Sequence, residues 1–259
     1  MLVRVWLVGL LDPVGSEEEI MAEQMTQKDI DFQERFNANT SPTNNEQFDK
    51  DGYLVIKNLW DPKDLYCEPP EIKGQYNYFG KIHKFNHVPL ENQVEGSTSR
   101  YYYPPYKFAH SQIRLKLEKA IGKKLYNTYY YDRFYNPGQE LTNHADRPAC
   151  EISVTVHISS NINTPWPIWI KTPDTYDDPE KKTEIVKKGE NRSVILGPGD
   201  GMIYKGCERP HWRDSMPTEY KRTWYGKKVE KEGLYYHQVF FHYVLADGIR
   251  AHCSYDRAR

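Results

Sequence analysis

Residues 125–159, LYNTYYYDRFYNPGQELTNHADRPACEISVTVHIS, hold two stretches with the pattern of β-strands. The first, 125–135, is rich in aromatic residues, which favour a pleated, extended backbone. The sequence NPGQ at 136–139 contains a proline and a glycine, as is typical of a turn. In the second stretch, 151–159, apolar and polar residues alternate, which indicates a strand with one buried face. This region therefore predicts two strands with a turn after the first.

More short strands are expected downstream. Apolar runs bounded by Gly and Pro occur at 165–171 (PWPIWIK), 191–204 (NRSVILGPGDGMIY) and 233–247 (GLYYHQVFFHYVLAD). Several short strands separated by such turns are typical of a β-sandwich or barrel. Upstream, residues 108–122 have apolar side chains at helical spacing and end at Gly122, which predicts a helix.

The N-terminal part has a different pattern. Residues 17–38 begin with acidic side chains and predict a helix. Residues 53–59 follow a turn signal and predict a strand, whereas residues 60–107 are rich in Pro, Tyr and Asn and show no sustained period. We therefore expect an N-terminal extension and helix over residues 1–45. One domain, mainly β with flanking helices, should follow over residues 46–259.

The composition limits the classes of partner. The chain has 259 residues and a net charge of −1, so no overall basic field predicts a nucleic-acid partner. The apolar run within residues 1–15 is too short to span a bilayer. The four cysteines form no C-x-x-C pair, which in a chain of this length predicts reduced thiols and a cytoplasmic location. We expect neither nucleic acid nor a membrane as partner.

His144 and Asp146 are candidate metal ligands. On extended backbone, residues i and i+2 point to one side, so the two side chains can reach one point. The pair alone is a weak signal, because a turn histidine with a capping aspartate has the same pattern. His211 is the preferred third ligand of the nine histidines, since it directly follows the strand–turn–strand pattern of 191–204. Two histidines and one carboxylate make the facial triad of non-haem Fe(II) oxygenases.

Four motifs in this order resemble the Fe(II)/2-oxoglutarate-dependent dioxygenase superfamily, most of all the bacterial and phage members of its prolyl-4-hydroxylase-like group: RFYNPGQELTNHADRPACEIS (133–153), PWPIWI (165–170), LGPGDGMIYKGCERPHWRD (196–214) and QVFFHYV (238–244). The resemblance covers residues 125–247. It implies a double-stranded β-helix, a jelly-roll or cupin-like barrel, with an α-rich N-terminal part. It also implies a hydroxylase whose Fe(II) is bound by His144, Asp146 and His211. The co-substrates would be 2-oxoglutarate and O2, the products succinate and CO2, and ascorbate an optional reductant.

The resemblance further implies a cation and a hydroxyl group that bind the far carboxylate of 2-oxoglutarate. Family members usually carry this Arg or Lys at the start of the last strand, and here that strand has neither. Arg213, two residues after His211, is the preferred substitute because a bidentate guanidinium suits a carboxylate. Arg222 is nearer the usual offset but lies in a polar insertion. Tyr135 is the expected hydroxyl partner, and Arg147 is a further candidate for orienting the ligand or substrate.

The substrate stays open between a free or peptidyl amino acid, such as proline, and a small metabolite. Asp146 favours hydroxylation, because halogenating relatives lack this carboxylate. Two other interpretations also stay open. One is a catalytically silent jelly-roll that binds a ligand or partner, which the missing basic residue on the last strand favours. The other is a cupin-like metal enzyme that uses no 2-oxoglutarate. Consumption of 2-oxoglutarate separates the first interpretation from the other two.

Overall fold

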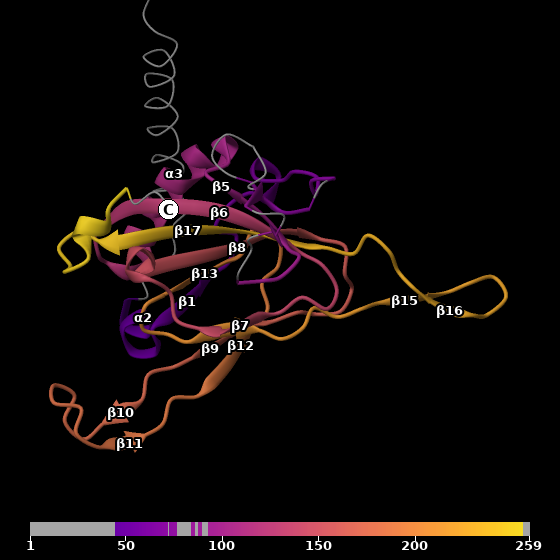
Figure 1. Cartoon of the computed structure of the whole chain (residues 1–259). Coiled ribbons are helices and arrows are strands. Elements are labelled where there is room, and N and C mark those ends of the chain that lie inside the picture. Colours follow the sequence, from indigo (N-terminus) through magenta and orange to yellow (C-terminus); the bar gives the residue numbers. More distant parts are fainter. Residues whose placement is uncertain (1–44, 72, 77–83, 86–87, 90–92, 256–259) are drawn as a thin grey trace, which may run out of the picture. The chain divides into compact units, whose positions relative to one another are not determined.

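The structure is a computed structural model, and it describes residues 45–71, 73–76, 84–85, 88–89 and 93–255 (Figure 1). By its internal contacts the chain divides into residues 1–41 and residues 42–259, and all described residues belong to the second unit. The helix predicted over 17–38 lies outside the described residues. The expected domain boundary after residue 45 stays a prediction.

Seven strands form the larger sheet. Their spatial order is β1 (Tyr53–Ile56), β13 (Gly201–Tyr204), β8 (Ile152–Ser160), β17 (Tyr236–Leu245), β6 (Leu125–Tyr135), β5 (Thr98–Tyr101) and β2 (Gln75–Tyr76). Neighbouring strands are antiparallel except β2 and β5, which are parallel. The ten-residue β17 pairs along most of its length with β6 on one side and β8 on the other. Its aromatic and β-branched side chains suit a position buried on both faces.

Four strands form the smaller sheet, in the order β12 (Asn191–Val194), β9 (Ile168–Lys171), β14 (His211–Arg213) and β7 (Leu141–His144). From β6 to β17 the chain passes repeatedly between the two sheets: β6 and β8 belong to the larger sheet, β7 and β9 to the smaller one. After β9 the alternation continues, because β12 and β14 lie in the smaller sheet and β13 and β17 lie in the larger one. Two sheets connected in this way make a jelly-roll. The predicted mainly-β jelly-roll is confirmed.

Two α-helices belong to the described residues: α2 (Asn45–Asp51) and α3 (Lys107–Ile121). Four 3₁₀ turns accompany them: η1 (Pro62–Asp64), η2 (Pro104–Tyr106), η3 (Pro148–Cys150) and η4 (Ala251–Cys253). Helix α3 ends at Gly122, which takes the left-handed conformation (φ 68°) that glycine adopts without strain. The helix predicted over 108–122 is therefore found within one residue. No helix among the described residues is long and apolar enough to cross a membrane.

Three two-stranded hairpins complete the described strands: β3–β4 (Lys84–Phe85 and Val88–Pro89), β10–β11 (Thr175–Tyr176 and Ile185–Lys187) and β15–β16 (Tyr220–Arg222 and Lys228–Glu230). The strand predicted over 53–59 ends earlier, at Ile56, and Asn58 beyond it has a positive φ of 50°. Strand β5 arises in the segment without a sustained period. Its buried side chains are polar, so no apolar alternation marks it.

Side chains alternate along β6 between the two faces of the larger sheet. Arg133 and Tyr135 lie on the inner face, where the Tyr135 ring packs edge-on against Trp166 at 5.0 Å between centroids. Asp132 points to the outer face, where its carboxylate bonds to His237. The inner face is the one toward the smaller sheet. Strand β6 therefore supplies polar side chains to two separate buried environments.

Candidate metal centre

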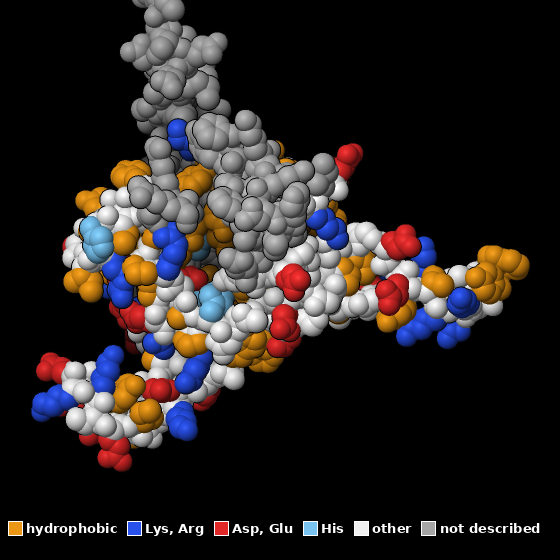
Figure 2. Space-filling view, in the orientation of Figure 1, with side chains coloured by type: hydrophobic (Ala, Val, Ile, Leu, Met, Phe, Trp, Pro, Cys, Tyr) orange, Lys and Arg blue, Asp and Glu red, His pale blue; other side chains and the backbone are white. Residues whose placement is uncertain are grey.

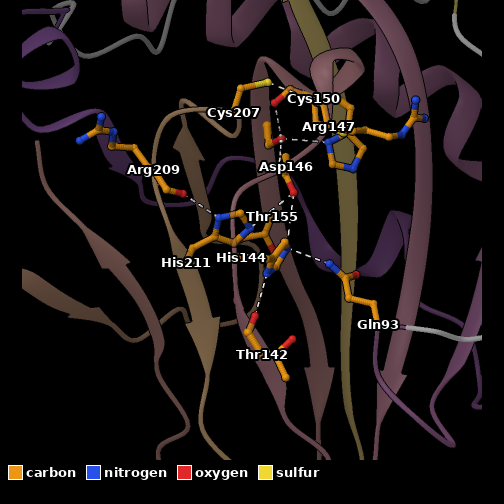
Figure 3. A network of polar contacts seen from close by, with 12 residues as sticks. Gln93, Thr142, His144, Asp146, Arg147, Cys150, Thr155, Cys207, Arg209 and His211 are labelled. Carbon is orange, nitrogen blue, oxygen red and sulfur yellow. Dashed lines mark hydrogen bonds and ion pairs between the residues drawn. The ribbon is translucent and has the colours of Figure 1, made fainter.

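His144 and His211 are directly opposite each other on neighbouring antiparallel strands. His144 ends β7, His211 begins β14, and the two residues are register partners. Their ring centroids are 4.3 Å apart. Asp146 follows β7, and its carboxylate Oδ1 lies 3.5 Å from His144 Nε2 and 3.7 Å from His211 Nε2 (Figure 3). The structure therefore brings the three predicted ligands together.

Backbone carbonyls orient both imidazole rings. His144 Nδ1 lies 2.8 Å from the carbonyl oxygen of Thr142, and His211 Nδ1 lies 2.9 Å from that of Arg209. A carbonyl oxygen only accepts, so each Nδ1 is the protonated nitrogen and donates. In a neutral ring with this tautomer the lone pair is on Nε2, and each Nε2 faces Asp146. This is the tautomer that a metal-binding histidine needs.

The Asp146 carboxylate is held in place by residues outside the motif. The backbone N–H of Asp146 donates to the Gly206 carbonyl at 2.9 Å. The carboxylate oxygen Oδ2 accepts from Ser153 Oγ, also at 2.9 Å. A Cβ atom on Gly206 would lie 2.4 Å from Asp146 Oδ2 and 2.3 Å from the Cys150 carbonyl oxygen. The close approach of these chains therefore requires glycine at position 206. The sequence motifs include Ser153 and Gly206 but did not single them out.

The charges in the cluster favour a cation. Burial by itself would raise the pKa of Asp146, but a side-chain contact with His144 and the electrostatic interaction with the neighbouring His211 imidazole hold that pKa well below its usual range. Burial lowers the pKa of His211, which favours its neutral form. An ionised carboxylate then faces two nitrogen lone pairs, and all three are electron-rich. Donors about 2.1 Å from one ion lie roughly 3–4 Å from each other, and Asp146 Oδ1 lies 3.5 and 3.7 Å from the two Nε2 atoms. The donor set fits a divalent metal ion.

Gln93 connects the cluster to the interior of the barrel. Its side-chain nitrogen lies 2.8 Å from His144 Nε2, and its Oε1 accepts from Arg133 Nη2 at 3.0 Å. Arg133 Nη1 in turn donates to the Tyr135 hydroxyl at 3.3 Å. Gln93 comes from the segment without a sustained period, and Arg133 is one of many polar residues on the aromatic strand. Neither carried a signal in the sequence.

Arg213 is a buried cation between the two sheets. It is 1% exposed, donates from Nη1 to the Trp166 carbonyl (2.7 Å) and from Nη2 to Gln238 Oε1 (2.8 Å), and packs on the Trp166 and Tyr236 rings. No described carboxylate forms an ion pair with it, and its Nε has no hydrogen-bond partner. A buried charge without a counter-charge is costly. This position is therefore suited to an anionic ligand.

The other predicted ligand-binding residues fall into two groups. Tyr135 belongs to the same buried apolar cluster as Trp166 and Tyr236, next to Arg213. Arg222 lies on β15, where all three residues are exposed. Arg147 is also exposed, and its guanidinium covers the Tyr129 ring at 4.5 Å. The structure thus places Tyr135 and Arg213 inside the barrel and leaves Arg222 on the surface.

No family model matches the chain, and no curated protein matches it. Solved structures with a similar chain trace include a prolyl-4-hydroxylase from Pseudomonas putida, at 11% identity over 76% of this chain and 95% of that one, with a TM-score of 0.45. EctD from S. alaskensis, solved with 2-oxoglutarate and 5-hydroxyectoine, is 13% identical over 78% of this chain and 74% of its own (TM-score 0.48). A 2OG-Fe(II) oxygenase family oxidoreductase from Burkholderia pseudomallei is 8% identical over 82% and 92% (TM-score 0.48). Because the identities and TM-scores are this low, the reactions of these proteins cannot be assigned to this chain. A function has to be argued from the side chains of this chain.

Proposed function

We propose that this protein is a non-haem Fe(II)- and 2-oxoglutarate-dependent dioxygenase that hydroxylates a C–H bond. The observation that carries the proposal is the convergence of His144 Nε2, His211 Nε2 and the Asp146 carboxylate on one point. Two neutral imidazoles and one carboxylate bind Fe(II) on one side and leave its other positions open to a co-substrate and O2. A structural zinc site would use four protein ligands.

Arg213 supports the 2-oxoglutarate part of the proposal. We assign it to the far carboxylate of 2-oxoglutarate, because it is a buried guanidinium without a carboxylate partner among the described residues. Gln238 and the Trp166 carbonyl fix its two terminal nitrogens, so the planar group is already oriented. The Trp166 and Tyr236 rings exclude water around it, which strengthens its attraction for an anion. Tyr135 would add a hydroxyl group from the same cluster.

The chain's residues bind and orient, while the bound groups carry out the oxidation. His144, Asp146 and His211 would hold Fe(II), which together with 2-oxoglutarate and O2 supplies the oxidising chemistry. Per turnover one substrate C–H bond becomes C–OH, 2-oxoglutarate becomes succinate and CO2, and both oxygen atoms of O2 are used. Ascorbate would serve as an optional reductant. The substrate would be a free or peptidyl amino acid, such as proline, or a small metabolite.

Two features weigh against the other interpretations. A catalytically silent jelly-roll would not need three converging metal donors together with a buried, unmatched Arg213. A cupin-like centre usually has three histidines and a glutamate. His242 is the other histidine near Asp146, but its Nδ1 is 2.9 Å from Ser153 Oγ, and that hydroxyl lies between it and the carboxylate. The ligand set of two histidines and one aspartate is the better fit.

Anaerobic addition of Fe(II) and 2-oxoglutarate tests the proposal. We expect the weak visible metal-to-ligand band in the wild-type protein and succinate formation once O2 is admitted. Asp146→Ala should lose both. Asp177→Ala, which removes a carboxylate from an exposed loop, should keep both and is the matched control. Absence of the band and of 2-oxoglutarate consumption in the wild type would favour the silent jelly-roll. In Arg213→Gln, a band and succinate formation that appear only at higher 2-oxoglutarate concentrations than in the wild type would support the assignment of the arginine.

A further inference from the structure

The β15–β16 hairpin lies in an insertion between β14 and β17, and its base is firmly attached. The Glu219 carboxylate accepts hydrogen bonds from the backbone N–H groups of Asn163 and Thr164 and pairs with Lys231 at 2.6 Å. Asn161 Oδ1 accepts from the Tyr235 backbone N–H at 2.8 Å. These contacts fix where the hairpin leaves the barrel. The residues beyond the base are mostly exposed.

Two aromatic side chains occupy the tip. The turn is closed by the Thr223 N–H to the Lys227 carbonyl (2.8 Å) and the Gly226 N–H to the Thr223 carbonyl (2.9 Å). Between these residues Trp224 is 96% exposed and Tyr225 is 61% exposed. An indole ring this exposed is unusual and marks a contact surface.

Four cations surround the aromatic tip. Lys221, Arg222, Lys227 and Lys228 lie within residues 220–229, which contain no acidic residue, although the whole chain has a net charge of −1. None of the four forms an ion pair with a described residue, and the Lys228 ammonium instead covers the Tyr220 ring at 4.0 Å. Figure 2 shows hydrophobic side chains at the end of this hairpin and Lys and Arg side chains behind them. The tip is thus both hydrophobic and strongly positive.

We propose that this hairpin binds the anionic lipid surface of a membrane, with Trp224 and Tyr225 in the headgroup layer and the four cations facing lipid phosphates. Trp and Tyr favour the membrane–water interface, and clustered Lys and Arg are attracted to anionic lipids. Either signal alone is weak, but two together give reversible peripheral binding. The turn satisfies the N–H groups of Thr223, Gly226 and Lys227 internally, so these groups can leave bulk water without losing hydrogen bonds.

The ring geometry favours lipid over single-stranded nucleic acid. Successive bases stack on aromatic rings that present open faces along the strand. The Trp224 and Tyr225 rings are instead almost perpendicular, at 85° and 5.3 Å between centroids. One face of the Tyr220 ring is covered by Lys228. Insertion into a headgroup layer requires no such alignment. The expectation of no membrane partner rested on the lack of a segment long enough to span a bilayer, and that property does not reflect a local surface cluster.

Vesicle co-sedimentation of the full chain tests the proposal independently of the proposed enzymatic function. We expect binding to phosphatidylcholine vesicles that contain phosphatidylglycerol, much weaker binding to pure phosphatidylcholine, and loss of binding at high salt. Trp224→Ala/Tyr225→Ala and Lys221→Glu/Lys227→Glu should each weaken binding by about tenfold or more. Ile185→Ala/Val186→Ala, on the exposed strand β11, should bind like the wild type. Near-UV circular dichroism would verify that each variant is folded.

Three results would overturn the proposal. The first is equal binding to neutral and anionic vesicles, and the second is wild-type binding by both hairpin variants. The third is evidence that the hairpin binds another partner. That evidence would be tighter binding to a single-stranded oligonucleotide than to anionic vesicles, or a dimer in light scattering that the Trp224→Ala/Tyr225→Ala variant no longer forms.

Discussion

The two faces of the larger sheet carry two polar clusters made from the same kinds of residue. The outer cluster consists of Cys67, Arg100, Tyr106, Asp132 and His237. The inner one is the His144, Asp146 and His211 centre with Arg213 deeper in the barrel. Each combines a carboxylate, a histidine and an arginine, and each brings three potential metal ligands within 4.8 Å of one another. Residue type alone therefore does not separate them.

The outer cluster satisfies its own charges. The Arg100 guanidinium donates from Nε to Asp132 Oδ2 at 3.1 Å, and from Nη2 to the same carboxylate, to Cys67 Sγ and to the Tyr106 hydroxyl. His237 Nε2 lies 3.0 Å from Asp132 Oδ2. A cation already occupies the point on which these groups converge. We therefore interpret this cluster as structural, a buried ion pair that joins β5, β6 and β17.

The inner cluster leaves its charges unmatched. The Asp146 carboxylate and the Nε2 atoms of His144 and His211 converge with no Lys or Arg bound among them in the described part of the chain, although Gln93 contacts His144 Nε2. The Arg213 guanidinium has no described carboxylate partner. A bound metal ion would balance the charge of the Asp146 carboxylate, and the carboxylate of a ligand would balance that of Arg213. The two clusters differ in charge balance and not in the presence of histidine and carboxylate, and this difference is what favours the inner cluster as the binding site.

The largest expected effect is on stability, and it separates the two clusters directly. Asp132→Ala leaves Arg100 buried without its partner and should lower the free energy of unfolding by about 3–5 kcal/mol. Asp146→Ala removes the hydrogen bond from Ser153 but leaves no buried charge without its partner, so it should destabilise the metal-free protein by much less, about 0.5–1.5 kcal/mol. Urea unfolding in EDTA measures both. Equal destabilisation by the two variants would mean that the inner cluster is also structural.

The next effect concerns 2-oxoglutarate affinity. Arg213→Gln keeps a hydrogen-bond donor but removes the charge, and should raise the KM for 2-oxoglutarate by about 10- to 100-fold, since a charge-assisted bond contributes about 1.5–3 kcal/mol. Arg222→Gln, an exposed control, should leave this KM unchanged. Initial rates of succinate formation give both constants. An increase in the Arg222 variant instead would move the assignment to the hairpin.

A smaller effect is expected at Gly206. Gly206→Ala places a methyl group against Asp146 Oδ2 and the Cys150 carbonyl, so the carboxylate must shift. Metal-ligand supports of this kind typically affect affinity by about 10- to 100-fold, and we expect the lower end of that range. Titration with Fe(II) under nitrogen measures the change. Gly226→Ala, where a Cβ meets no atom within 4 Å but the backbone is left-handed (φ 84°), is the control for a glycine substitution away from the centre. Unchanged Fe(II) affinity in Gly206→Ala would show that Asp146 is not a ligand or is free to relax.

Much of the fold and the three candidate ligands could be predicted because their signals are local. The strand of residues 125–135 and the helix ending at Gly122 follow from residue type and periodicity over short windows. His144 and Asp146 are two residues apart, and their shared direction is a property of extended backbone. Strand β5, by contrast, has buried polar side chains whose partners lie on another strand. Gln93, Ser153 and Gly206 are near the centre only because distant segments meet there.

The sequence by itself determined the alternation of strands and turns and the local pairing of a histidine with an aspartate, since both depend on neighbours along the chain. Only the tertiary structure decided that β14 pairs with β7 in the register that sets His211 opposite His144. It also decided that Arg100 pairs with a carboxylate, that Arg213 pairs with no carboxylate of the described residues, and that Arg222 stays on the surface. Register, burial and charge balance arise from contacts between residues far apart in sequence, so no local pattern records them.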